Sequence, residues 1–233
     1  MGKRRNEEFI SIVWHELRTP LSSIRWYLSM VLEWDMWEIT PETRKALNHC
    51  YESSVRLIKL VNDVLALSKV ESWKMEYYMK DTDIVSLLKS VYNDIYLEAE
   101  AKKIDFVVEI DSKLKDEIIN IDEDKIKQVF LNIINNAIKF TEVWWKVILK
   151  ATRDKNKVLF EVIDNWIWIP KDKLKSVFDK FTQVESSLQR ENASWLGLWL
   201  ALSKSFLSDF DTEINVKSEL GVWSNFSFEL KLV

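Results

Sequence analysis

A histidine and a glutamate stand side by side near the start of the chain, at His15 and Glu16. Neutral imidazole is a good nucleophile near pH 7, and an adjacent carboxylate can orient the ring and accept its proton. Thr19 follows four residues after His15, so the two share one face of a helix, one turn apart. The adjacent pair His15 and Glu16 suits a nucleophile and its base. An isolated histidine is more often an ordinary solvated side chain, so the other motifs must decide whether His15 has a catalytic role.

Two asparagines and a lysine form a second group, at Asn132, Asn136 and Lys139. The asparagines are four residues apart and share a helical face, and the lysine lies one step round it. Amide oxygens can ligate Mg²⁺ directly or through its waters, and a lysine can neutralise phosphate. An ordinary polar face does not predict these residues on an otherwise apolar helix. We therefore expect a magnesium–phosphate site with Asn132 and Asn136 as the metal ligands.

A pair of long helices must position the histidine. Apolar residues in alternating four- and three-residue steps predict one helix from about Glu7 to Glu33 and another from Thr40 to about Glu71. Thr40 and Pro41 suit the N-cap and the first position of the second helix. The apolar seams comprise Leu17, Leu21, Ile24, Leu28 and Val31 in the first helix and Leu47, Cys50, Ser54, Leu57, Val61 and Val64 in the second.

Two long helices joined by a short loop form an antiparallel hairpin. A hairpin alone leaves apolar surface exposed, which favours self-association into a dimeric four-helix bundle. Packing of the hairpin against the chain's own second domain is the alternative. We therefore expect residues 1–72 to form a dimerisation domain.

The character of the sequence changes after Ser72. Helix-like segments and short strand-like segments follow one another without a regular βαβ repeat. This pattern predicts that residues 73–233 form an α+β sandwich, with helices layered on one sheet. The expected helices are Ile84–Ala101, Asp124–Phe140 and about Leu198–Ser208, and the expected strands are Ile104–Ile110, Ile118–Ile121, Val147–Thr152, Val158–Ile163, Ile214–Val216 and Phe226–Leu232.

The overall composition excludes several other functions. A net charge of −4 and a pI near 5.5 argue against a general nucleic-acid-binding protein. No run approaches the roughly 18 apolar residues of a membrane span, and the start lacks the apolar core of a signal peptide. A single cysteine, Cys50, fits a reducing compartment. We expect a cytoplasmic location, which includes the cytoplasmic part of a membrane-anchored sensor, with no membrane contact in this segment.

The motifs, in this order, resemble those of sensor histidine kinases of two-component systems over essentially all 233 residues. The matching segments are His15–Leu21 for the H-box, Asn132–Thr141 for the N-box, Val162–Pro170 for the G1 box, Phe178–Phe181 for the Phe-x-x-Phe segment, and Trp195–Ala201 and Gly221–Phe226 for the later glycine-rich boxes. The resemblance implies a HisKA-type dimerisation and histidine phosphotransfer hairpin. It also implies that a Bergerat-type, GHKL-type ATP-binding sandwich follows the hairpin.

The resemblance implies a reaction as well. His15 would receive the γ-phosphoryl group of Mg-ATP, and the group would then pass to an aspartate in the receiver domain of a response regulator. Thr19 would position the water that dephosphorylates this regulator. The catalytic residues implied are therefore His15, Glu16 and Thr19, in a homodimer that forms through the hairpin.

The resemblance further implies a nucleotide site. Asp164 follows an apolar strand, where the family's aspartate accepts a hydrogen bond from the adenine amine. The nucleotide-binding residues carried over from the family's motifs are Asn132, Asn136, Lys139, Phe140, Asp164, Trp166, Trp168, Phe181, Trp195, Leu196, Gly197, Leu198 and Trp199.

Tryptophan stands where the family has glycine at Trp166, Trp168, Trp195, Trp199 and Trp223. The chain has 3 glycines and 12 tryptophans, whereas glycine usually makes up about 7% of a protein. Trp34, Trp37, Trp73 and the pair at 144 and 145 lie in predicted turns, where glycine supplies positive φ. Trp14 and Trp26 stand where glycine is common in the related kinases, so all twelve tryptophans fit the pattern. Our hypothesis is that the source organism reads UGA as glycine and that the sequence was translated with UGA as tryptophan.

The hypothesis distinguishes two forms of the chain. With glycine at the five family positions, here named the glycine-restored chain, we expect an active kinase. With tryptophan, we expect very weak ATP binding and poor folding of the second domain. Two alternatives stay open, namely a non-catalytic dimeric scaffold (a pseudokinase) if the tryptophans are genuine, and an ATPase of the same superfamily that does not phosphorylate histidine.

Overall fold

The computed structural model describes residues 17, 19–32, 39–71, 75–141, 144–165, 173–180, 182, 198–219 and 222–233. The chain divides into two compact units, Met1–Met75 and Glu76–Val233. No helix among the described residues is long and apolar enough to cross a membrane.

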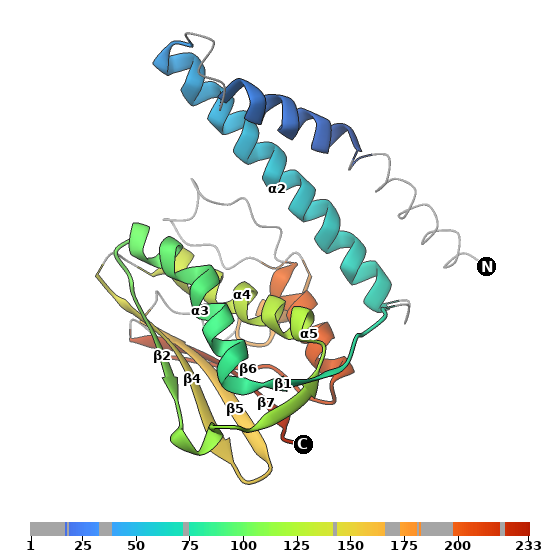
Figure 1. Cartoon of the computed structure of the whole chain (residues 1–233), viewed down its shortest axis with the longest axis vertical. Helices are drawn as coiled ribbons and strands as arrows, with labels where there is room; N and C mark the ends of the chain where they lie inside the picture. The colour runs from blue at the N-terminus through green and yellow to red at the C-terminus, as the bar shows by residue number, and fades with distance from the viewer. Residues whose placement is uncertain are drawn as a thin grey trace, which may run out of the picture. The chain divides into compact units, whose positions relative to one another are not determined.

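The first unit is a helical hairpin, as the sequence predicts. Residues 19–32 are helical and run beside α2 (Pro41–Glu71) in Figure 1. Thr40 caps α2, because its Oγ1 accepts a hydrogen bond from the backbone N–H of Thr43 at 3.2 Å. Arg44 then ties the two helices together, since its Nη1 donates to the carbonyl oxygen of Leu32 at 2.9 Å.

The apolar seam of the hairpin is exposed within a single chain. In the first helix the exposed fractions are 45% for Leu17, 49% for Ile24 and 39% for Val31, which stand at seven-residue intervals. In α2 they are 46% for Leu57 and 40% for Val64, again seven residues apart. This regular spacing forms a stripe of apolar surface along each helix, which one chain leaves uncovered.

The second unit contains a five-stranded sheet with the strand order β2-β4-β5-β7-β6. Its strands are β2 (Asp105–Ile110), β4 (Lys146–Asp154), β5 (Lys157–Asp164), β6 (Asn215–Glu219) and β7 (Trp223–Lys231). Only β2 and β4 pair in parallel, and the other neighbours are antiparallel. A separate antiparallel pair joins β1 (Lys80–Asp83) to β3 (Ile118–Ile121).

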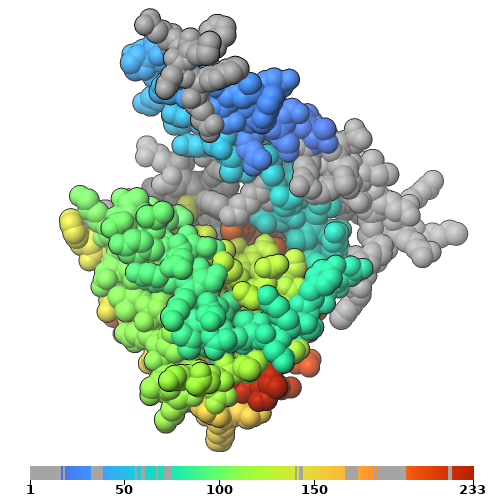
Figure 2. Space-filling model, in the orientation of Figure 1, coloured from blue at the N-terminus to red at the C-terminus, as the bar shows by residue number. Residues whose placement is uncertain are grey.

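Three helices cover one face of this sheet (Figure 1), namely α3 (Ile84–Ala101), α4 (Glu123–Phe140) and α5 (Trp199–Asp209). The core between the two layers includes a cluster of Phe130, Phe160 and Phe228, whose ring centroids lie 5.1–5.3 Å apart. Residues of α3 form much of the surface seen in Figure 2. The fold is therefore the α+β sandwich that the sequence predicts, with β1 as an additional strand.

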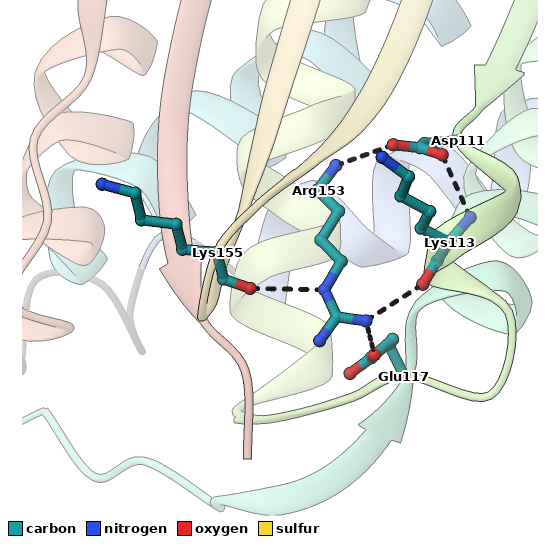
Figure 3. Close-up of polar contacts among 5 residues, drawn as sticks. All are labelled: Asp111, Lys113, Glu117, Arg153 and Lys155. Atoms are coloured by element: carbon teal, nitrogen blue, oxygen red, sulfur yellow. Dashed lines mark hydrogen bonds and ion pairs between the residues drawn. The ribbon is translucent and has the colours of Figure 1, made fainter.

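A network around Arg153 braces the turn between β4 and β5 (Figure 3). The guanidinium group pairs with Glu117 and donates to the carbonyl oxygens of Lys113 and Lys155. The carboxylate of Asp111 accepts from the backbone N–H groups of Lys113 and Arg153. These contacts join the β4–β5 turn to the short 3₁₀ helix Ser112–Leu114, which stiffens this end of the sheet.

Candidate functional site

The described residues contain part of the predicted site. Those described are Thr19, Asn132, Asn136, Lys139, Phe140, Asp164, Leu198 and Trp199, with only the helical backbone described at Phe140. Those outside the described residues are His15, Glu16, Trp166, Trp168, Phe181, Trp195, Leu196 and Gly197. Thr19 lies exposed on the first helix, where its carbonyl oxygen accepts a hydrogen bond from Oγ of Ser23 at 3.1 Å.

The helix α4 carries the two asparagines. It begins at a strong N-cap, because Oδ1 of Asp122 accepts from the backbone N–H of Lys125 at 3.1 Å and two acidic residues follow in the first turn. Its apolar face is buried against the sheet. Asn132 is only 2% exposed, and its Nδ2 donates to Oγ of the fully buried Ser203 on α5 at 3.1 Å. This bond orients the amide of Asn132 and links α4 to α5, while Asn136 is half-buried one turn later.

Lys139 lies in the last turn of α4 beside a second lysine. Nζ of Lys102 donates to the carbonyl oxygens of Ile138 at 3.0 Å and Lys139 at 3.2 Å, which satisfies two of the unpaired carbonyls at the end of the helix. Burial, together with the charge of Lys102, lowers the pKa of Lys139 to about 8. Two neighbouring ammonium groups that repel each other favour an anion, so this end of α4 suits a phosphate.

Asp164 is the last residue of β5 and is only 1% exposed. It is held between Val147 of β4 and Ser224 of β7 in the sheet register. A carboxyl group buried to this extent is costly unless it is engaged in polar interactions. Its position at the end of a buried strand fits the acceptor that the sequence predicts for the adenine amine.

The first turn of α5 is the third part of the site. Leu198 and Trp199 are buried, at 1% and 7% exposure, and no side chain caps the helix at Leu198. Backbone N–H groups at such a helix start can bind phosphate when the chain permits close approach. The face of α4 and the buried Asp164 therefore fit a nucleotide. Trp199 does not fit a nucleotide, because its large indole replaces the glycine that leaves the backbone accessible in the family.

Trp144 provides a geometric test of the glycine hypothesis. Its φ is 72°, and it is the one aromatic residue with positive φ among the described residues. It is 77% exposed in the turn between α4 and β4, where its backbone N–H donates to the carbonyl oxygen of Lys103 at 2.9 Å. A bulky residue is strained in this region and glycine is not. The support does not extend to Trp145, which lacks positive φ although the sequence places it in the same turn, or to Trp26, which is helical and exposed.

Replacing Trp144 by glycine is expected to stabilise the second unit by about 1 kcal/mol, because relief of backbone strain exceeds the entropy lost by ordering a glycine. The melting temperature should rise by roughly 2–4 °C. Trp145→Gly is the matched control, since Trp145 does not have positive φ and is half-buried. It should lower the melting temperature. Equal destabilisation in both variants would contradict the strain argument.

The ATP affinity of the glycine-restored chain is expected to fall as the pH rises through about 8. Protonated Lys139 attracts phosphate, and the protonated fraction decreases above its pKa of about 8. The loss should reach roughly tenfold between about pH 7 and about pH 9.5. Calorimetric titration at several pH values measures it. Lys139→Arg stays protonated over this range and should remove this pH dependence; an identical profile in both proteins would refute the assignment.

Two residues of the site were not found from the sequence. Ser203 lies in an apolar stretch of α5, and only the folded structure shows that it holds Asn132. Lys102 follows α3 in a turn, and nothing in its local pattern indicates that it caps α4. Both act through tertiary contacts between elements, which sequence periodicity does not reveal.

Two family models match the chain. The one described as the His Kinase A (phospho-acceptor) domain matches residues 5–73. The one described as the histidine kinase-, DNA gyrase B-, and HSP90-like ATPase matches residues 121–233. The first match includes His15, and the second includes α4, Asp164 and the start of α5.

Curated relatives match nearly the whole chain. The circadian input-output histidine kinase CikA of Synechococcus elongatus is 29% identical over 94% of this chain. The aerobic respiration control sensor protein ArcB of Escherichia coli is 32% identical over 98% of it. The chain spans 29% of the length of each of these two relatives.

Solved structures show the same fold. Full-length ShkA in complex with AMPPNP has a TM-score of 0.80 at 29% identity, covering 97% of this chain and 46% of that one. The histidine kinase AdeS of Acinetobacter baumannii has a TM-score of 0.65 at 20% identity, covering 93% and 97%. Together with the two family models, these relatives show that the chain belongs to the sensor histidine kinases, with a phospho-acceptor domain followed by an ATP-binding domain.

Proposed function

We propose that this chain autophosphorylates His15 from Mg-ATP and passes the phosphoryl group to an aspartate of a response regulator. Residues 1–72 form the dimerisation and phosphotransfer domain, and residues 73–233 form the catalytic domain. The observation that carries the proposal is the convergence on α4 and α5 of three features, namely the oriented Asn132, the electropositive Lys139 and the uncapped helix start at Leu198. A nucleoside triphosphate is the ligand that uses all three of these features.

The chemistry assigns a role to each residue. The unprotonated ring nitrogen of His15 attacks the γ-phosphorus of ATP, the bond to the bridging oxygen breaks, and ADP leaves. Glu16 accepts the proton from the other ring nitrogen. Lys139 neutralises phosphate charge, and Asn132 and Asn136 would hold the Mg²⁺ that offsets the charge on the leaving ADP. Thr19 orients the water that later dephosphorylates the regulator.

The exposed stripe on the hairpin supports a homodimer. Leu17, Ile24 and Val31 on the first helix and Leu57 and Val64 on α2 are each more than a third exposed in one chain. Burying such a stripe against a second copy is strongly favourable, since apolar area removed from water contributes about 25 cal/mol per Å². Four helices packed in this way form a bundle, with one His15 in each subunit.

Incubation of the glycine-restored chain with γ-labelled ATP and Mg²⁺ tests this proposal. The expected product carries phosphate that is stable in base and lost in acid, and mass spectrometry should locate it on the peptide that contains His15. Phosphate on a serine or an aspartate would overturn the assignment. Release of free phosphate without a labelled protein would instead favour an ATPase of the same superfamily.

A second candidate function follows from the buried Trp199. If the source gene has UGG at the five family positions, the tryptophans are genuine and the chain is a non-catalytic dimeric scaffold. If the codons are UGA and the native protein contains glycine there, the kinase is favoured. Sequencing the gene and weighing the native protein by mass spectrometry decide between the two.

A further inference from the structure

A short segment ahead of β1 is fixed to the end of α5. It comprises residues 76–79 and contains neither helix nor strand. The ring of Tyr77 packs edge-on against Phe206 and Phe210, with centroid distances of 6.5 and 5.2 Å. Its hydroxyl donates to Oδ2 of Asp209 at 2.5 Å. One aromatic side chain therefore makes both apolar and polar contacts with the last turn of this helix.

The same segment is also fixed to α4. The backbone N–H of Tyr78 donates to Oδ2 of Asp122 at 2.9 Å, while Oδ1 of the same carboxylate caps α4. Asp122 is only 4% exposed, so both bonds are shielded from water. The side chain of Tyr78 is 76% exposed. The attachment at residue 78 therefore depends on the backbone and not on the ring.

The two helices that hold the segment are those that carry the candidate nucleotide residues. Asp209 is the last residue of α5, and Trp199 at the candidate phosphate site is the first. Asp122 is the N-cap of α4, and Lys139 lies in the last turn of that helix. A helix is a stiff element, so the anchor at Tyr77 fixes where the chain leaves the nucleotide-binding helices.

The connection to the hairpin is short. The helix α2 ends at Glu71, so the five residues 72–76 lie between it and the anchored Tyr77. The backbone bond of Tyr78 to Asp122 is adjacent to the anchored ring, and we expect it to open when Tyr77 is released. Loss of both contacts would lengthen the connection up to β1, which begins at Lys80. Transfer between two linked groups depends on how often they meet in the reactive geometry, and a longer connection dilutes that geometry.

We infer that Tyr77 is a positioning residue, which limits the connection to five residues so that bound ATP reaches His15 in the reactive geometry. The inference rests on the proposed function. Burial and the neighbouring Asp209 carboxylate raise the pKa of Tyr77 well above its usual value, so the hydroxyl stays protonated and remains a donor.

The test uses the full glycine-restored chain. Tyr77→Ala should slow phosphorylation of His15 at saturating ATP by roughly tenfold, with the dissociation constant for ATP unchanged. Tyr77→Phe keeps the ring and should have a smaller effect. Asp209→Asn keeps an acceptor oxygen and should retain most of the rate. Tyr78→Ala is the matched control, since it keeps the backbone bond to Asp122, and should behave like the parent.

Hydrogen exchange of residues 76–79 provides a second measurement, independent of catalysis. Exchange should become faster in Tyr77→Ala and stay unchanged in Tyr78→Ala. An unchanged rate in Tyr77→Ala, or an equal loss of rate and ATP affinity, would overturn the positioning role while the parent remains an active kinase. Absence of phosphorylation in the parent as well would overturn the proposed function, and this inference with it.

Discussion

The glycine-restored chain is expected to bind ATP at least ~100-fold more tightly than the chain with tryptophan. Bonds from backbone N–H groups to charged oxygens contribute about 1.5 kcal/mol or more each, and loss of two of them costs ~3 kcal/mol. That cost corresponds to ~100-fold in affinity. The start of α5 is where this difference arises most directly, because Trp199 is buried in the first turn of a helix without a side-chain cap.

Calorimetric titration with ATP and Mg²⁺ measures the difference. Trp26→Gly in the tryptophan form is the matched control, since Trp26 lies exposed on the hairpin helix and in the other unit. It removes one indole without altering a candidate phosphate-binding segment, so its ATP affinity should not change. Micromolar affinity in the unaltered tryptophan form would refute the prediction.

Much of the fold could be predicted because its elements have strong local signals. The helix predicted at Ile84–Ala101 has the same bounds in the structure, since Asp83 caps it and its apolar residues recur with helical spacing. The Thr40 cap of α2 follows from the same kind of local signal. By contrast, β1 is the sequence Lys-Asp-Thr-Asp, which lacks apolar alternation. It is a strand because it pairs with β3, and local sequence does not record that pairing.

In the candidate site, too, some features follow from local sequence and others depend on tertiary contacts. The asparagines and Lys139 could be placed on one helical face from their spacing alone. The bond from Asn132 to Ser203, the cap by Lys102 and the anchor at Tyr77 join residues that are 36 to 132 positions apart. The lowered pKa of Lys139 depends on burial and on Lys102, so it too required the tertiary structure.

His15→Gln is expected to abolish acid-labile phosphorylation of the glycine-restored chain. Glutamine is similar in length and is a good helix former, so the hairpin and its seam should persist. It lacks a nucleophilic ring nitrogen, and no phosphoramidate can form. Loss should exceed about 1,000-fold, because the covalent step itself is removed. ATP affinity should be unchanged, since the nucleotide residues belong to the other unit.

The chain contains one other histidine, and it provides the matched control. His49 lies exposed on α2, so its imidazole is accessible to solvent and is the alternative acceptor. It lacks the adjacent carboxylate of His15, because Asn48 and Cys50 flank it. His49→Gln should therefore keep the full rate of phosphorylation. Phosphate that persists in His15→Gln and disappears in His49→Gln would transfer the acceptor role to α2, and the reading of His15 and Glu16 as nucleophile and base would be wrong.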